Sequence, residues 1–251
     1  MTFTDRESTR EHARQHSQLM DQLYSAQSND SYARTVVYGV DATMPTGVDS
    51  NAVPSIEIIN QTTVDAIMQT DGREKSMVLD FASYTYPGEK YAAGDYAQEE
   101  SLFHHSNLYE VLTLFVDSYY AYNKDNKNNS LYLDRALYIP DIVFEDTGKR
   151  QCDVIVCSAP NYRSAAKHYA IDAWTNHCAL RDRIKFIKAV AESNLPDTLI
   201  LGSWGTGIFN QNVVDVANTF RQVFKHSPIK KLVYAIPDED AFKLFNEVYE
   251  V

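Results

Sequence analysis

The feature that most limits the fold of this chain is an alternation between short apolar runs and longer stretches with helical character. The apolar runs are bounded by turn-forming residues, as buried strands are, and they lie at 35–40, 55–60, 77–83, 136–144, 152–160, 198–203 and 231–236. Helical character is found at 5–25, 61–70, 98–122, 164–193, 213–224 and 239–249, with breaks at 28–31 and near Asn176. Strands that alternate with helices predict an α/β fold in which helices cover both faces of a mixed or largely parallel sheet.

The length and continuity of the chain favour a single domain. A chain of 251 residues can bury one large α/β core, and it contains no internal repeat, low-complexity tract or long linker. We therefore expect residues 1–251 to form one domain, with residues 1–30 as an N-terminal helical extension.

The charge distribution limits the classes of ligand. The formal net charge is −11, and no cluster of basic residues is longer than the pair Lys230-Lys231. Because binding to a phosphate backbone relies on clustered Lys and Arg, nonspecific nucleic-acid binding is not expected. A small anionic ligand remains possible, since backbone N–H groups can hold phosphate without charged side chains. The oligomeric state is left open.

The expected compartment is the cytoplasm. No apolar run approaches the roughly 18–20 residues that cross a bilayer, and the N-terminal residues are polar. We expect neither a membrane span nor secretion. Cys152, Cys157 and Cys178 leave an odd thiol in any disulfide scheme and have no zinc-type spacing, so they are interpreted as buried thiols in a reducing compartment.

The first candidate for chemistry is Gln98-Glu99-Glu100, which opens a helical segment after a predicted strand and a Pro87-Gly88 turn. Ligands of open α/β sheets bind beyond the carboxyl ends of strands, and a helix N-terminus stabilises an ionised carboxylate. Adjacent helical residues point about 100° apart, so the two glutamates can reach different atoms of one ligand. The alternative is an ordinary surface helix whose first-turn acids complement its dipole.

The second candidate is the glycine-containing segment from Gly202 to Phe209, between a predicted strand and a predicted helix. Its glycines permit a close approach of backbone to ligand, and the following helix start offers unpaired N–H groups to a diphosphate. It is not a complete dinucleotide fingerprint, because Asn210 occupies the third glycine position. The alternative is a tight connection in which glycine serves packing.

Histidines and tyrosines give weaker signals. No histidine pair has metal-ligand spacing, so neither a metal nor another cofactor is expected; His104-His105, His168 and His177 are interpreted as surface or hydrogen-bonded helix residues. Four tyrosines precede the glutamates and either stack on a base or ribose or simply pack: Tyr84, Tyr86, Tyr91 and Tyr96.

Several of these segments, taken in order, resemble one known family. They are VLDFAS, the QEE triplet followed by SLFHHSNLY, DVIVCSAPN, and the stretch RDRIKFIKAVAESNLPDTLILGSWGTGIFNQN. The chain thereby resembles the bacterial-type poly(ADP-ribose) glycohydrolases of the macrodomain superfamily, in register from about residue 10 to 245. The resemblance implies a macrodomain-like fold and ADP-ribose, or an ADP-ribosylated substrate, as the ligand.

The resemblance also implies roles for individual residues. Glu100 matches the catalytic acid, which would protonate the leaving ribose oxygen and then, as a carboxylate, activate the attacking water. Glu99 matches the glutamate that holds a ribose hydroxyl, and Asp80 stands where the family has an asparagine near the terminal ribose. The residues that it assigns to ligand binding are Asp80, Phe81, Ala82, Gly88, Gln98, Gly205, Thr206, Gly207, Ile208 and Phe209.

The sequence also departs from the family pattern at four places. The family's triple glycine becomes Gly88-Glu89-Lys90, the asparagine before that loop is Tyr86, Asp80 replaces an asparagine, and Asn210-Gln211 replaces Gly-Asn. Two hypotheses follow: hydrolysis of an ADP-ribose glycosidic bond, favoured by both retained glutamates, or binding of ADP-ribose or a related NAD-derived nucleotide without turnover, favoured by the altered loop.

Overall fold

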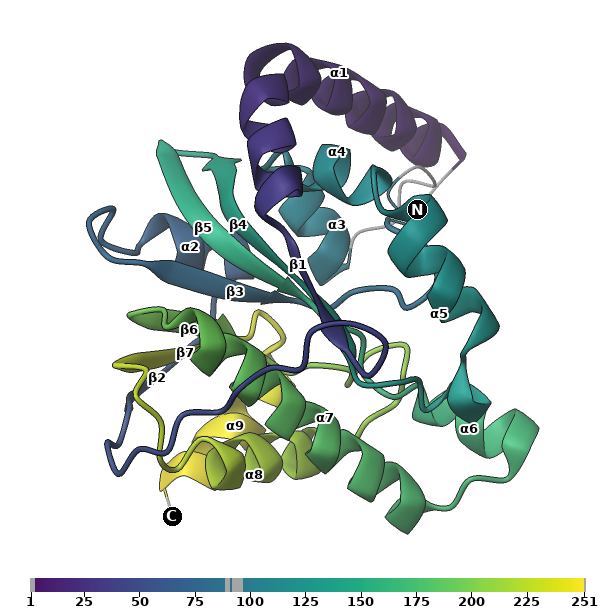
Figure 1. Ribbon diagram of the computed structural model, residues 1–251, viewed down its shortest axis with the longest axis vertical. Coiled ribbons are helices and arrows are strands. Elements are labelled where there is room, and N and C mark those ends of the chain that lie inside the picture. The colour runs from purple at the N-terminus through teal and green to yellow at the C-terminus, as the bar shows by residue number, and fades with distance from the viewer. Residues whose placement is uncertain (1–2, 89–90, 92–96, 251) are drawn as a thin grey trace.

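A seven-stranded sheet with helices on both faces forms the centre of the molecule (Figure 1). The computed structural model describes residues 3–88, 91 and 97–250. The strands are β1 (Val36–Gly39), β2 (Ser55–Ile59), β3 (Ser76–Asp80), β4 (Arg135–Glu145), β5 (Lys149–Val156), β6 (Thr198–Leu201) and β7 (Lys231–Ala235). The helices are α1 (Phe3–Arg34), α2 (Thr63–Met68), α3 (Gln98–Phe103), α4 (Leu108–Thr113), the π-helix η1 (Val116–Tyr120), α5 (Ala121–Asp125), the 3-10 turn η2 (Asn128–Ser130), α6 (Tyr162–Tyr169), α7 (Ala173–Asn194), α8 (Val213–Val223) and α9 (Glu239–Glu250). The expected α/β class is confirmed.

The sheet is mixed, with the strand order β1-β4-β5-β3-β6-β7-β2. The strands β5, β3, β6, β7 and β2 are parallel to their neighbours, whereas β4 is antiparallel to both β1 and β5. Because β3 lies between β5 and β6, the chain leaves all three strands at the same edge of the sheet. That edge is where ligands of open α/β sheets bind.

The core has two halves, which the central strand β3 separates. Met77 and Leu79 point into the half covered by α7, α8 and α9, whereas Val78 points into the half covered by α2, α3, α4 and η1. Successive side chains of a strand point to opposite faces of the sheet, so Asp80, two residues after Val78, faces the side of α3 and η1. The register of one apolar strand thus directs a carboxyl group toward the predicted glutamates.

The N-terminal helix is longer than the sequence predicts. It runs to Arg34 with a kink at Tyr24, so the expected break at 28–31 is wrong. Tertiary contacts hold this segment helical: Ser28 and Ser31 are buried, and the amide of Asn107 donates to the Ser28 hydroxyl (2.8 Å). Figure 1 shows the two arms of α1 lying over α4 and the end of the β4–β5 pair.

The long helical segment expected at 98–122 is divided into α3, α4 and η1. The chain leaves the helix at 104–107 because this segment hydrogen-bonds to the end of β4: Ser106 and Phe144 form an isolated bridge, and Glu145 donates its N–H to the His105 carbonyl (2.7 Å). Tertiary pairing therefore overrides a local pattern that continues as helix.

The expected break near Asn176 is also wrong in position. Helix α6 ends at Ala170, which is left-handed (φ 52°), and Asp172 caps α7 by accepting the N–H of Thr175 (2.7 Å). Asn176 instead lies inside α7, where its amide donates to the Gln211 side chain (2.8 Å). This contact ties α7 to the segment after the glycine turn.

The burial of the cysteines and the character of the helices can be compared with the sequence expectations. All three thiols are free; Cys152 and Cys157 are buried as expected, whereas Cys178 is only half-buried. Among the helices that the structure describes, none combines the length and apolar character that crossing a membrane requires.

Candidate active site

Two of the predicted segments leave the sheet side by side. The parallel strands β3 and β6 pair through Val78 and Ile200, and the chain turns out of them at Asp80 and Leu201. A Cβ built on Gly202 would lie 3.1 Å from the Phe81 ring and 2.6 Å from a backbone oxygen of Ala235, so only glycine fits between these segments. The segment that carries Asp80 and the start of the glycine-containing segment are therefore in contact.

Gln98 fixes the start of α3 to the end of β3. Its side-chain oxygen accepts the N–H of Phe81 (2.8 Å), and its side-chain nitrogen donates to the carbonyl of Leu79 (3.0 Å). Both ends of the amide are thus used by the backbone of the neighbouring strand. Gln98 positions the two glutamates that follow it, and a direct ligand contact by Gln98 stays a prediction.

Asp80, Glu99 and Glu100 form a buried group of three carboxyls, which we call the carboxyl cluster. All three are at most 5% exposed. Glu100 accepts the N–H of Ala97 (3.2 Å), and Glu99 accepts the N–H of Ser83 (3.3 Å). Neither oxygen of Asp80 has a hydrogen-bond partner among the described residues, and the same holds for Oε1 of Glu99.

Burial and mutual repulsion set the protonation of this cluster. Burial, and then the negative charge of Glu100, raise the pKa of Asp80 well above its usual range. Burial, and then Asp80 and Glu100, likewise raise the pKa of Glu99, although N–H groups of Ser83 and Gly88 oppose this shift. A cluster of this kind combines a proton donor with a proton acceptor, which is the requirement for general acid/base chemistry.

The glycine turn, residues 205–209, offers donors rather than charge. Gly205 adopts a left-handed conformation (φ 78°), and its carbonyl accepts the N–H of Gln211 (3.0 Å). Within the described part of the chain, the N–H groups of Gly207, Ile208 and Phe209 have no hydrogen-bond partner. Three successive free N–H groups next to a positive-φ residue can bind an anion such as a diphosphate.

The start of helix α8 contributes fewer free N–H groups to this turn than the sequence predicts. The helix begins at Val213, and Asn212 caps it by accepting the N–H of Asp215 (3.0 Å). Thr206 uses its hydroxyl within the turn, donating to the Ser203 carbonyl (2.8 Å). The free donors therefore belong to the turn itself.

Aromatic rings line the side of the glycine turn. Phe209 packs edge-on against Tyr132 (ring centroids 6.1 Å apart), and Tyr132 stacks on Tyr84 (4.1 Å). Ile208 is half exposed. Of the tyrosines singled out in the sequence, Tyr84 thus belongs to this aromatic group, whereas Tyr91 is buried against α3 and Tyr96 lies outside the described residues.

The loop before the glutamates is only partly described. Gly88 is left-handed (φ 58°), and a Cβ there would lie 2.9 Å from the Phe103 ring, so glycine is required at this position. Ala82, another predicted ligand contact, is buried. Glu89 and Lys90, the altered positions of the family's triple glycine, lie outside the described residues.

His104 is buried, which differs from the expectation of a surface histidine. It is 6% exposed and packs against Tyr91, with His12 and His16 of α1 nearby (ring centroids 5.6 and 6.5 Å). Burial, and then the charge of His12, lower the pKa of both His16 and His104 to about 4. No group of three or more His, Cys, Asp or Glu residues within the described ranges has the arrangement of a metal site.

The sequence interpretation missed Tyr120. This residue ends the π-helix η1, is fully buried, and its hydroxyl lacks a hydrogen-bond partner among the described residues. Burial, and then the charges of Glu99, Tyr119 and Asp80, raise its pKa well above the usual range, which puts it beside the carboxyl cluster. The π-turn that orients it has no signature in a single sequence, although such turns are frequent at functional sites.

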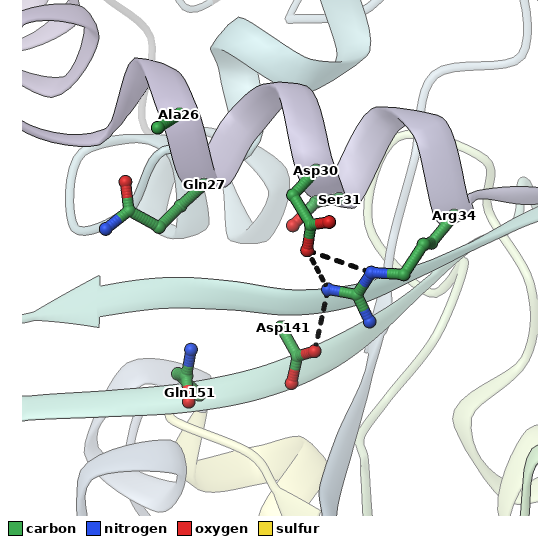
Figure 2. A pocket seen from close by; sticks show the side chains of 7 residues that line it. All are labelled: Ala26, Gln27, Asp30, Ser31, Arg34, Asp141 and Gln151. Carbon is green, nitrogen blue, oxygen red and sulfur yellow. Dashed lines mark hydrogen bonds and ion pairs between the residues drawn. The ribbon is translucent and has the colours of Figure 1, made fainter.

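Two surface cavities contain none of the predicted site residues. The first, about 300 Å³, lies between α1 and the β4–β5 pair, and there Arg34 is already paired with Asp30 and Asp141 (Figure 2). The second, about 410 Å³, lies between α7 and α8; its Lys185 and Lys188 are paired with carboxylates. Neither offers an unpaired cation to an anionic ligand.

A mixed sheet with buried carboxyls and a glycine turn at one strand edge defines a macrodomain-like α/β protein. The chain belongs to the family of microbial-type poly(ADP-ribose) glycohydrolase (PARG) catalytic domains, whose model matches residues 2–146. That family consists of glycohydrolases that act on glycosidic bonds of ADP-ribose. No curated protein matches the sequence significantly.

Solved structures agree on the fold. The poly(ADP-ribose) glycohydrolase of Thermomonospora curvata is 23% identical, with a TM-score of 0.85 over 97% of this chain and 100% of the other. The same enzyme bound to the inhibitor ADP-HPD gives 0.82 at 23% identity, over 96% and 99%. The Deinococcus radiodurans enzyme in complex with ADP-ribose gives 0.77 at 24% identity, over 89% and 97%.

Proposed function

We propose that this protein binds ADP-ribose groups at the carboxyl edge of β3 and β6 and hydrolyses their glycosidic bond, with Glu100 as the general acid and base. The observation that carries the proposal is the carboxyl cluster, which is buried at the end of β3, while the segment after the neighbouring strand β6 carries three free N–H groups. Poly(ADP-ribose) glycohydrolases of this fold have been solved with ADP-ribose and with ADP-HPD. The cytoplasm is the proposed compartment, because the three thiols are free.

The proposed reaction needs one proton donor and one positioned water. Cleavage of an O-glycosidic bond passes through an oxocarbenium-like state, so a neutral Glu100 would first donate its proton to the leaving ribose oxygen. The resulting carboxylate would then remove a proton from the attacking water. Negative charge that remains within the cluster would stabilise the positive charge that develops on the ribose.

The remaining predicted residues would bind the substrate. The free N–H groups of Gly207, Ile208 and Phe209 would hold the diphosphate, and Glu99 would accept a hydrogen bond from a ribose hydroxyl. The turn would thereby fix a flexible anionic ligand so that one carboxyl can act, which is chiefly a contribution of positioning. Ligand contacts by Phe81, Ala82 and Gly88 are further predictions of this arrangement.

The alternative is ADP-ribose binding without turnover. It is favoured by the altered loop, in which Gly88-Glu89-Lys90 replaces the family's triple glycine. Both functions predict binding, and only hydrolysis separates them.

The deciding experiment measures ADP-ribose released from poly(ADP-ribose) and from ADP-ribosylated protein. We expect release by the unaltered protein and a fall in kcat of roughly 10²–10⁴ for Glu100→Gln, the range typical of losing a general acid/base. The matched control is Glu57→Gln, an exposed glutamate on the distant edge strand β2, which should act like the unaltered protein. Equal inactivity of the unaltered protein and Glu100→Gln on every substrate would contradict hydrolysis, and calorimetric binding of ADP-ribose would then favour the alternative.

A further inference from the structure

The carboxyl cluster and its surroundings contain buried polar atoms that receive no hydrogen bond from the described residues. Four buried polar atoms lack a partner within the described part of the chain: both oxygens of Asp80, one oxygen of Glu99 and the hydroxyl of Tyr120. An unpaired buried polar atom is destabilising, so atoms of this kind indicate a group that binds there. A sugar, which carries several hydroxyls, can both donate to and accept from such atoms.

The hydrogen-bond donors are distributed unequally among the three acids. Glu99 accepts backbone N–H groups of Ser83 and Gly88, and Glu100 accepts the N–H of Ala97. Asp80 accepts none from the described residues, although it is fully buried at the end of a central strand. A carboxylate without donors in an apolar interior is the least stable anion of the group.

Among the residues that the structure describes, the neighbours of Asp80 offer it no cation. The titratable groups that face it are Glu99 and Glu100 from α3, Tyr120 from η1 and Cys157 after β5. Each of these is neutral or negative near neutral pH, so none supplies a positive charge that would favour ionisation of Asp80. This environment therefore favours the neutral form of Asp80.

We propose that Asp80 binds the ligand as a neutral carboxylic acid that donates a hydrogen bond to a sugar hydroxyl, so that ligand binding requires a proton on Asp80. In this form the residue has the donor and acceptor pattern of an amide, which explains how an acid can occupy this position. Tyr120 acts as a positioning residue, because its hydroxyl is a donor beside Asp80 and Glu99 that lessens the cost of their ionisation. The inference rests on the proposed ADP-ribose site.

The test measures the Kd of ADP-ribose by calorimetry between pH 5.5 and pH 9. Once pH exceeds the pKa of Asp80, the Kd of the unaltered protein should rise about tenfold per pH unit, with uptake of a proton on binding. Calorimetry in two buffers of different ionisation enthalpy counts this proton. Asp80→Asn keeps the shape and the donor, so it should bind well across the range and lose the Asp80-linked proton uptake.

Two further variants sharpen the test. The matched control Asp117→Asn changes an exposed acid on η1 itself and should retain the pH dependence of the unaltered protein. Tyr120→Phe removes one donor near the cluster, so the rise in Kd should begin at a higher pH. A role for Tyr120 in packing alone would not move that midpoint.

The inference is overturned if Asp80→Asn has the same pH dependence as the unaltered protein, or if it is folded and does not bind. A protein that bound no ADP-ribose at any pH would contradict the proposed function instead. Melting curves measured without ligand test the protonation of Asp80 independently of ADP-ribose binding. As pH rises from 5 to 9, the melting temperature of the unaltered protein should fall relative to that of Asp80→Asn, and a constant difference would refute the inference.

Discussion

Replacing Gly205 with alanine tests whether the conformation of the glycine turn is fixed by the fold. Gly205 has a φ of 78°, and a Cβ there would lie 2.7 Å from the Ala159 Cβ and 3.1 Å from the Gln211 side chain. A left-handed backbone costs alanine about 1–2 kcal/mol. The steric overlap costs about 1–3 kcal/mol more. The lower entropy of the unfolded chain offsets about 0.4–1 kcal/mol of this.

The net loss of unfolding free energy for Gly205→Ala is therefore about 1–5 kcal/mol, by the same strain and overpacking costs. For a chain of this size each kcal/mol lowers the melting temperature by roughly 2–4 °C. The assay is thermal unfolding without ligand, followed by calorimetric titration with ADP-ribose. We expect a lower melting temperature and weaker binding, because the free N–H groups of the turn begin two residues after Gly205.

Gly207 supplies the matched control, because it belongs to the same turn but is unconstrained. A Cβ at Gly207 would have no heavy atom within 4 Å, and its φ lies outside the left-handed range. Gly207→Ala should leave the melting temperature nearly unchanged and weaken ADP-ribose binding only through contact with the diphosphate. The reasoning is refuted if Gly205→Ala melts like the unaltered protein, or if the two variants lose equal stability.

Two further predictions concern stability. Burial lowers the pKa of His16 and His104 from 6.5 to about 4, so the unfolded chain takes up protons at these residues more readily than the folded protein. The midpoint of urea unfolding should therefore be highest above about pH 6.5 and fall as the pH drops toward about 4. His104→Phe should flatten this profile, and an unchanged slope would contradict the assignment. Thr62 caps α2 by accepting the N–H of Asp65 (3.1 Å), so Thr62→Ala should cost about 1 kcal/mol in chemical unfolding, whereas Thr62→Ser, which keeps the oxygen, should cost less.

The apolar runs of the sequence determined the strands. The runs at 77–83 and 198–203 became β3 and β6, although both strands end earlier, at Asp80 and Leu201, where the chain turns out of the sheet. Strand positions follow from local patterns of apolar residues, because a run that is apolar throughout must be covered on both faces. The QEE motif likewise marked the start of α3 correctly, at Gln98.

Helix boundaries depended on contacts that the sequence does not display. The helix pattern at 98–122 was interrupted because residues 104–107 pair with the end of β4, and α1 continued through the polar stretch at 28–31 because Ser28 is buried against Asn107. In both places a distant segment supplied the hydrogen bonds that decided the backbone conformation. Local propensity is a weak predictor wherever tertiary partners of this kind are present.

The candidate site shows the same division. The sequence alone determined the acids and glycines and, through the alternation of strands and helices, the sheet edge at which their segments leave the sheet. Only the tertiary structure decided that Asp80 would lie in the carboxyl cluster with no donor among the described residues, and that a π-turn would bring Tyr120 beside it. The physical reason is that protonation and hydrogen bonding depend on burial and on neighbours from separate elements, and these are properties of the packed chain.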